Sequence, residues 1–86
     1  MDRQEVERIL HEIEHTLHTL HEQQNAKARQ AAHRLRPDLT AEDLLNPDNF
    51  ADIISDPDFM YEDGIAAGIL SAKIAVRAKL KEILVP

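Results

Sequence analysis

The sequence contains no cysteine and no tryptophan, only two glycines, and only three aromatic side chains. Without cysteine the chain forms neither a disulfide framework nor a thiolate metal site, and we expect it in the reducing cytoplasm. Strands favour β-branched and aromatic residues, and tight turns favour glycine. Because both are scarce beside abundant Leu, Ile, Ala, Glu and Arg, the composition predicts an all-α protein.

Long apolar runs are also missing, and the chain starts with the charged, periodic segment MDRQEVERIL. A membrane-spanning helix needs about 20 consecutive apolar residues, so we expect no membrane span, and the charged start does not resemble a signal peptide. The formal net charge is −6. Nucleic-acid binding needs basic surface that displaces counterions, so we do not expect it, whereas basic proteins remain candidate partners.

Helical periodicity is the strongest feature that is present. Residues 2–36 contain no proline or glycine, and their apolar residues recur in steps of three and four. They predict one helix of roughly 50 Å, at about 1.5 Å per residue. A second helix is predicted over residues 57–84. The residues expected to pack in the core or at a dimer contact are Val6, Leu10, Ile13, Leu17, Leu20, Ile65, Gly68, Ile69, Ala72, Val76, Leu80 and Ile83.

The segment between the two long helices contains a series of signals for helix starts. Thr40 followed by Asp43 resembles a capping box, and both Asn46-Pro47 and Asp56-Pro57 place a capping side chain before a proline. They predict short helices near 41–45 and 48–55. At 86 residues, we expect residues 1–86 to form one domain, near the lower size at which one hydrophobic core suffices.

Charge alternates along the chain in four blocks. Residues 1–22 hold six acids and two bases, 23–36 four bases, 37–63 nine acids, and 64–86 four bases and one acid. Opposite charges face each other if the long helices fold back on one another, which predicts an antiparallel hairpin. Because an exposed ion pair contributes about 0 to 1 kcal/mol, we expect charge to select this arrangement rather than to supply its stability.

The second long helix carries two apolar faces, a bulky one and a stripe of small residues around Gly64, Gly68 and Ala72. A two-helix hairpin has one interface, whereas two hairpins in a four-helix bundle bury both faces. We therefore expect a homodimer. In fold alone this resembles the small dimeric bundle proteins of the Rop kind, a likeness that implies no function. The alternative is a monomer whose connector folds over the hairpin as a lid, through Leu44, Leu45, Phe50, Ile53 and Ile54.

Residues 11–21, HEIEHTLHTLH, hold four of the five histidines. On a helical wheel His11, His15 and His18 cluster within about 60°, beside Glu22 and away from the apolar stripe. A histidine pair at positions i and i+4 can chelate zinc, nickel or copper, but a lasting site needs further ligands and residues that orient the rings. We interpret the cluster as solvated surface. A surface metal site and a pH-responsive surface are the alternatives.

Other candidate sites are weaker. Glu12 and His15 have the ExxH spacing of di-iron bundles, but both point outward. The acidic connector lacks the spacing of a calcium loop; we expect Asp48, Asp52, Asp56 and Asp58 to act as helix caps or to dock a basic partner.

We find no catalytic triad, no phosphate-binding glycine loop and no paired carboxylates, and therefore predict no catalytic residues and no cofactor. The sequence thus predicts a non-enzymatic, homodimeric interaction or adaptor module. A metal-responsive protein that uses the histidine cluster is the alternative, and a small helical enzyme with a concave acidic pocket is a third hypothesis.

Overall fold

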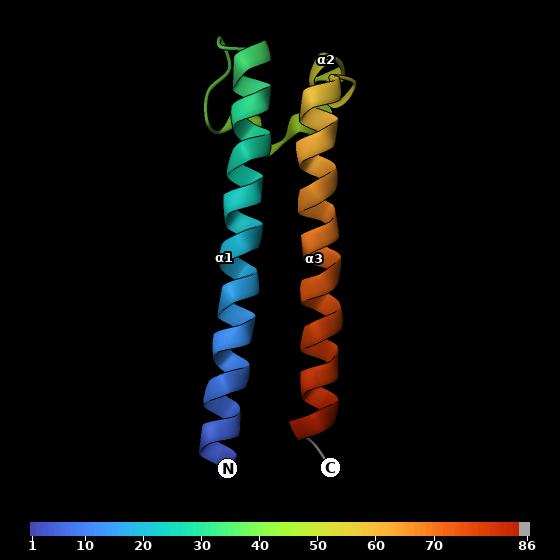
Figure 1. The fold of residues 1–86 in the computed structure, drawn as a ribbon. Coiled ribbons are helices and arrows are strands. Elements are labelled where there is room, and N and C mark those ends of the chain that lie inside the picture. The colour runs from blue at the N-terminus through green and yellow to red at the C-terminus, as the bar shows by residue number, and fades with distance from the viewer. Residues whose placement is uncertain (85–86) are drawn as a thin grey trace.

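The computed structural model describes residues 1–84, which form two long helices lying side by side (Figure 1). No strand occurs in this part of the chain. The all-α prediction is therefore confirmed, with its long N-terminal and C-terminal helices. The molecule is a rod measuring 53 × 17 × 17 Å. In chain order its elements are α1 (Arg3–Leu35), η1 (Asp43–Leu45), η2 (Pro47–Asn49), α2 (Ala51–Ile54) and α3 (Pro57–Leu84).

Local sequence signals explain the ends of the long helices. The Asp2 side chain accepts a hydrogen bond from the Glu5 N–H at 2.8 Å and caps α1, which ends before Pro37. Asp56 accepts the Phe59 N–H at 2.9 Å and caps α3, whose first residue is proline. Both helices lie within one residue of their predicted bounds.

The two long helices are antiparallel. Arg3 at the start of α1 donates to the Leu84 carbonyl at the end of α3 at 3.4 Å, and Gln24 donates to the Glu62 carbonyl at 3.0 Å. Within residues 1–84, however, no ion pair of 4 Å or less joins α1 to α3. The complementary charge blocks thus form no direct ion pair between the helices, and any attraction over longer distances is weakened by solvent and salt.

Residues seven apart line the seam between the helices, the spacing of a coiled-coil contact. On α1 they are Leu10, Leu17, Gln24 and Ala31, and on α3 they are Phe59, Ala66, Lys73 and Leu80, all buried or half-buried. Gln24 and Lys73 are polar, so the seam is apolar at its ends and mixed in the middle.

The hydrophobic core gathers where the connector, residues 36–56, packs against the long helices. Ile53 of α2 is fully buried, and Leu39 and Phe50 pack against the same cluster. Leu44, Phe50 and Ile53 belong to the connector that the lid alternative expected to fold over the hairpin, whereas Leu45 and Ile54 stay exposed. The buried members of the core are Ala28, Ala31, Ala32, Leu44, Ile53 and Phe59.

The connector differs from the two predicted short helices. Thr40 and Asp43 do form the predicted capping box: the Asp43 N–H donates to the Thr40 hydroxyl at 3.1 Å and the Thr40 N–H donates to the Asp43 carboxylate at 3.0 Å. The helix that follows is only the 3-10 turn η1, shorter than the predicted helix over residues 41–45. The predicted helix over 48–55 is divided into η2 and α2 at Phe50, whose backbone is extended. Phe50 packs against the core and beneath the Arg36 guanidinium, 5.7 Å from its ring centroid. These tertiary contacts override the local helical signal.

Candidate functional site

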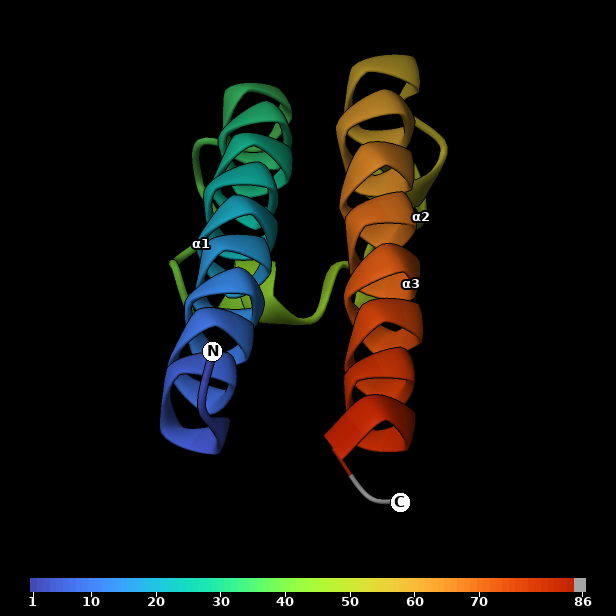
Figure 2. The same ribbon diagram turned by 60° about the horizontal axis from the view of Figure 1, so that its bottom comes forward.

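The connector covers only one broad face of the hairpin. It crosses behind α1 and α3 near one end, whereas both helices are uncovered along their length on the opposite side (Figures 1 and 2). Leu44 on η1 lies over α1 beside Arg29 and His33, which marks the covered side of that helix. We call the opposite, uncovered side the open face.

Aliphatic side chains occupy the open face. At about 100° per residue, Ile9, Ile13 and Leu20 project from α1 on the side of the seam away from Arg29 and the connector. Their exposed fractions are 38, 41 and 45%. A shallow depression of about 550 Å³ runs between the helices here, lined by Arg8, Ile9, Glu12, Ile13, Thr16, Leu17 and Val76. From α3, Ile65 and Ile83 continue the aliphatic surface, exposed by 37 and 62%.

The predicted core and dimer residues divide into two groups in a single chain. Those half-buried or buried along the seam are Val6, Leu10, Leu17, Ile69, Val76 and Leu80. Those that stay exposed are Ile13, Leu20, Ile65, Gly68, Ala72 and Ile83. Half of the predicted set is therefore accessible to a second molecule.

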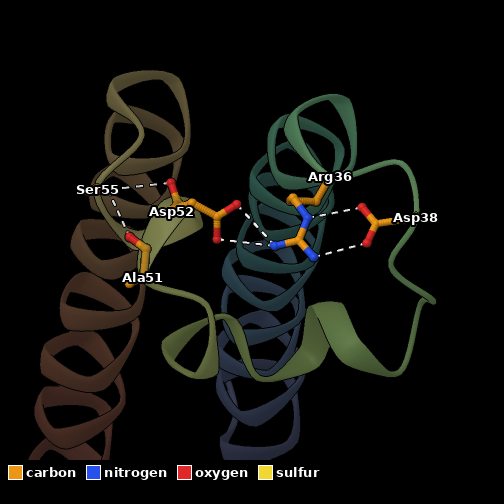
Figure 3. A network of polar contacts seen from close by, with 5 residues as sticks. All are labelled: Arg36, Asp38, Ala51, Asp52 and Ser55. Carbon is orange, nitrogen blue, oxygen red and sulfur yellow. Dashed lines mark hydrogen bonds and ion pairs between the residues drawn. The ribbon is translucent and has the colours of Figure 1, made fainter.

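Arg36 organises the acidic connector (Figure 3). Its guanidinium pairs with Asp38 at 2.9 Å and with Asp52 at 3.1 Å. The hydrogen bond from Arg36 holds the pKa of the Asp38 carboxyl below its usual value, and the bonds to both carboxylates raise the pKa of Arg36. Asp52 thus has a structural role as an ion-pair partner.

Of the four carboxylates predicted to dock a partner, Asp56 also has a structural role, because it caps α3. Asp48 and Asp58 are exposed, and Asp48 lines a depression with the apolar side chains of Ile54, Phe59 and Met60. These two residues remain as candidates for contact with a basic partner.

The predicted histidine cluster lies on the connector side of the rod. His11, His15 and His18 line a depression of about 230 Å³ with Glu14, and α3 supplies its other wall through Lys73 and Arg77. We call this site the histidine depression. Glu22 is exposed and does not line it. The sequence indicated the outward direction of the histidines, but their two basic neighbours follow from the register of the helices.

No arrangement for a metal ion occurs in residues 1–84, where no three His, Asp or Glu side chains come together suitably. The ExxH pair is also separated, since Glu12 lines the open-face depression and His15 lines the histidine depression.

Among the described residues, no helix combines the length and apolarity needed to cross a membrane. The chain matches no protein-family model, no curated protein and no solved structure.

Proposed function

We propose that this protein is a non-enzymatic helical interaction module that forms a homodimeric four-helix bundle through its open face. The observation that supports this is the exposure of Ile9, Ile13, Leu20, Ile65 and Ile83, which are 37 to 62% exposed and, at about 100° per residue, project to the open face. Scattered apolar side chains are ordinary on a protein surface, whereas a contiguous apolar surface is typical of an interface.

A second copy of the chain is the proposed occupant of the open face. A symmetric dimer buries the same stripe on both molecules, with a gain of about 25 cal/mol per Å² of apolar area. The core of the single chain is small: within residues 1–84, Ile53 is the only large side chain that is less than 2% exposed. Further burial is therefore expected to stabilise the chain. On α3 the small residues Gly68 and Ala72 permit close approach of another helix.

The adaptor role is assigned to the connector, which lies away from the proposed dimer contact. Asp48 is exposed there, and Asp58 is exposed on the adjoining first turn of α3; both offer negative charge to a basic partner protein. Reversal of both to lysine is expected to abolish recovery of basic partners, with Glu22→Lys at an exposed position inside α1 as the control; unchanged recovery would contradict the adaptor role. The cytoplasm remains the expected location, because the chain has no disulfide that depends on an oxidising compartment.

The experiment that tests the dimer is light scattering at neutral pH in a chelator, over a concentration series. The expected molar mass is twice the 9.8 kDa of one chain. Ile13→Lys and Ile65→Lys place charge on the open face and are expected to give monomers that retain helical circular dichroism. Ile74→Lys is the matched control, because Ile74 is 60% exposed but projects from the other side of α3. A wild-type monomer at every concentration would contradict the dimer.

The metal-responsive alternative has less support. Lys73 and Arg77 place positive charge beside the three histidines, which disfavours a bound cation. The metal-responsive alternative predicts that zinc, nickel or copper raises the melting temperature of the wild type, and that the double variant His15→Gln, His18→Gln shows no such rise. The absence of any rise in the wild type would contradict this alternative.

A further inference from the structure

We propose that the histidine depression binds a phosphate group, carried by a free anion or by a small phosphorylated molecule. The site lies on the connector side of the rod, so it is independent of the dimer contact proposed for the open face. Its walls come from both long helices: His11, Glu14, His15 and His18 from α1, and Lys73 and Arg77 from α3.

The two cations of the site have no carboxylate within ion-pair distance among the described residues. Within residues 1–84, neither Lys73 nor Arg77 takes part in an ion pair of 4 Å or less. Lys73 is half-buried, and its Nζ instead lies 3.1 Å from Nδ1 of His18. An ammonium group only donates hydrogen bonds, so Nδ1 accepts, and the neutral ring carries its proton on Nε2. His18 thereby keeps an N–H donor in addition to those of the two cations.

The balance of donors and acceptors favours an anion. Lysine offers three N–H donors, arginine offers five in a planar fork that matches phosphate, and each histidine ring offers at least one. Glu14 is the only carboxylate in the lining. The depression measures about 230 Å³, whereas a water molecule takes about 30 Å³ in the liquid. It therefore has room for a phosphate group in place of several waters.

The charged groups around the depression do not reverse this balance. Glu7, one turn before His11, is paired with Arg3 at 3.0 Å. Glu22 lies one turn beyond His18, and Lys81 one turn beyond Arg77. The lining itself holds two cations, Lys73 and Arg77, against the single carboxylate of Glu14. The site therefore keeps a positive balance that favours an anion.

The test is a titration of the full chain with each probe, monitored through the NMR signals of the histidine rings. The buffer contains a chelator and has a constant ionic strength. The probes are inorganic phosphate and glycerol phosphate, each at pH 7.5. Saturable shifts are expected for His11, His15 and His18. The signal of His33, which lies beside the connector, is expected not to move.

Two variants and a matched control assign the binding. Lys73→Gln and Arg77→Gln are expected to lower the affinity at least tenfold while circular dichroism is unchanged, since both positions lie outside the hydrophobic core. Lys79→Gln removes the same charge from an exposed position of α3 outside the depression and is expected to retain binding. Light scattering in the same buffer reports the dimer separately.

Each result has a defined meaning. Saturation by inorganic phosphate identifies a free anion as sufficient, and saturation by glycerol phosphate alone identifies a small phosphorylated molecule; both support the site. Shifts that do not saturate, that include His33 equally, or that survive Arg77→Gln unchanged would overturn it.

Discussion

Arg36, which directly follows α1, donates two hydrogen bonds to the Asp52 carboxylate of α2, at 3.3 and 3.1 Å (Figure 3). The same guanidinium donates to both oxygens of Asp38 at 3.0 and 2.9 Å. One side chain thus connects the end of α1 to the beginning of the connector and to its last helix. This relationship holds the connector over one face of the hairpin and leaves the other face open.

The lowered pKa of Asp38 predicts a pH-dependent contribution to stability. A carboxyl with a lower pKa in the folded state stabilises that state above its unfolded pKa, and the contribution is lost as pH falls through the folded pKa. Asp38→Asn is therefore expected to lower the urea midpoint at pH 7 and to leave it unchanged near pH 2. Asp63→Asn is the control for loss of an exposed charge. Equal losses at both pH values would contradict the role of the Arg36 hydrogen bond.

Gln24 and Glu62 form the polar contact inside the seam. Gln24 is 7% exposed and donates both to the Glu62 carbonyl and to its side-chain carboxylate. Gln24→Ala is expected to lower the free energy of unfolding by about 2 kcal/mol, and by about 1 kcal/mol in a Glu62→Ala background. Chemical denaturation of the four chains of this double-mutant cycle measures the coupling. Equal costs in both backgrounds would show that the two side chains do not interact.

Ile53 is expected to control attachment of the connector. Its side chain is fully buried, so Ile53→Ala is expected to cost about 2 to 5 kcal/mol of unfolding free energy. The neighbouring Ile54 is 42% exposed, and Ile54→Ala is expected to cost about 0.5 to 1 kcal/mol. Urea denaturation monitored by circular dichroism compares the two variants. Similar costs would mean that α2 packs through a different face.

Gly64 and Gly68 lie inside α3, where an added Cβ atom would meet, apart from the adjacent backbone of its own helix, no described atom within 4 Å. Glycine in a helix interior is about 1 kcal/mol less favourable than alanine. Gly64→Ala and Gly68→Ala are therefore each expected to raise the free energy of unfolding of the dissociated chain by roughly this amount, measured at high dilution. A loss of stability at concentrations where the chain self-associates would place another backbone against α3 at that glycine.

The long helices could be predicted from sequence because their determinants are local: the caps at Asp2 and Asp56, the proline at 37 and the apolar periodicity. The short helices of the connector could not be predicted in the same way, because the interruption of the helix at Phe50 depends on contacts with Arg36 and with the core. Burial of Ala28 and Ala32 likewise depends on distant residues. The outward direction of the histidines follows from periodicity, whereas the position of Lys73 beside His18 follows from helix register.

The connector joins the two long helices at one end of the rod, and this determines how far apart in sequence the contacting residues are. Sequence separation grows steadily away from the connector, from 38 residues for Gln24 and Glu62 to 55 for His18 and Lys73 and 81 for Arg3 and Leu84. Contacts of small separation close at the lowest entropic cost, and here the best-buried side chains lie at the same end. The helices are therefore expected to pair from the connector outward and to separate in the reverse order. Amide-exchange protection is expected to fall along the rod, with the end near Arg3 opening to solvent many times for each opening of the core.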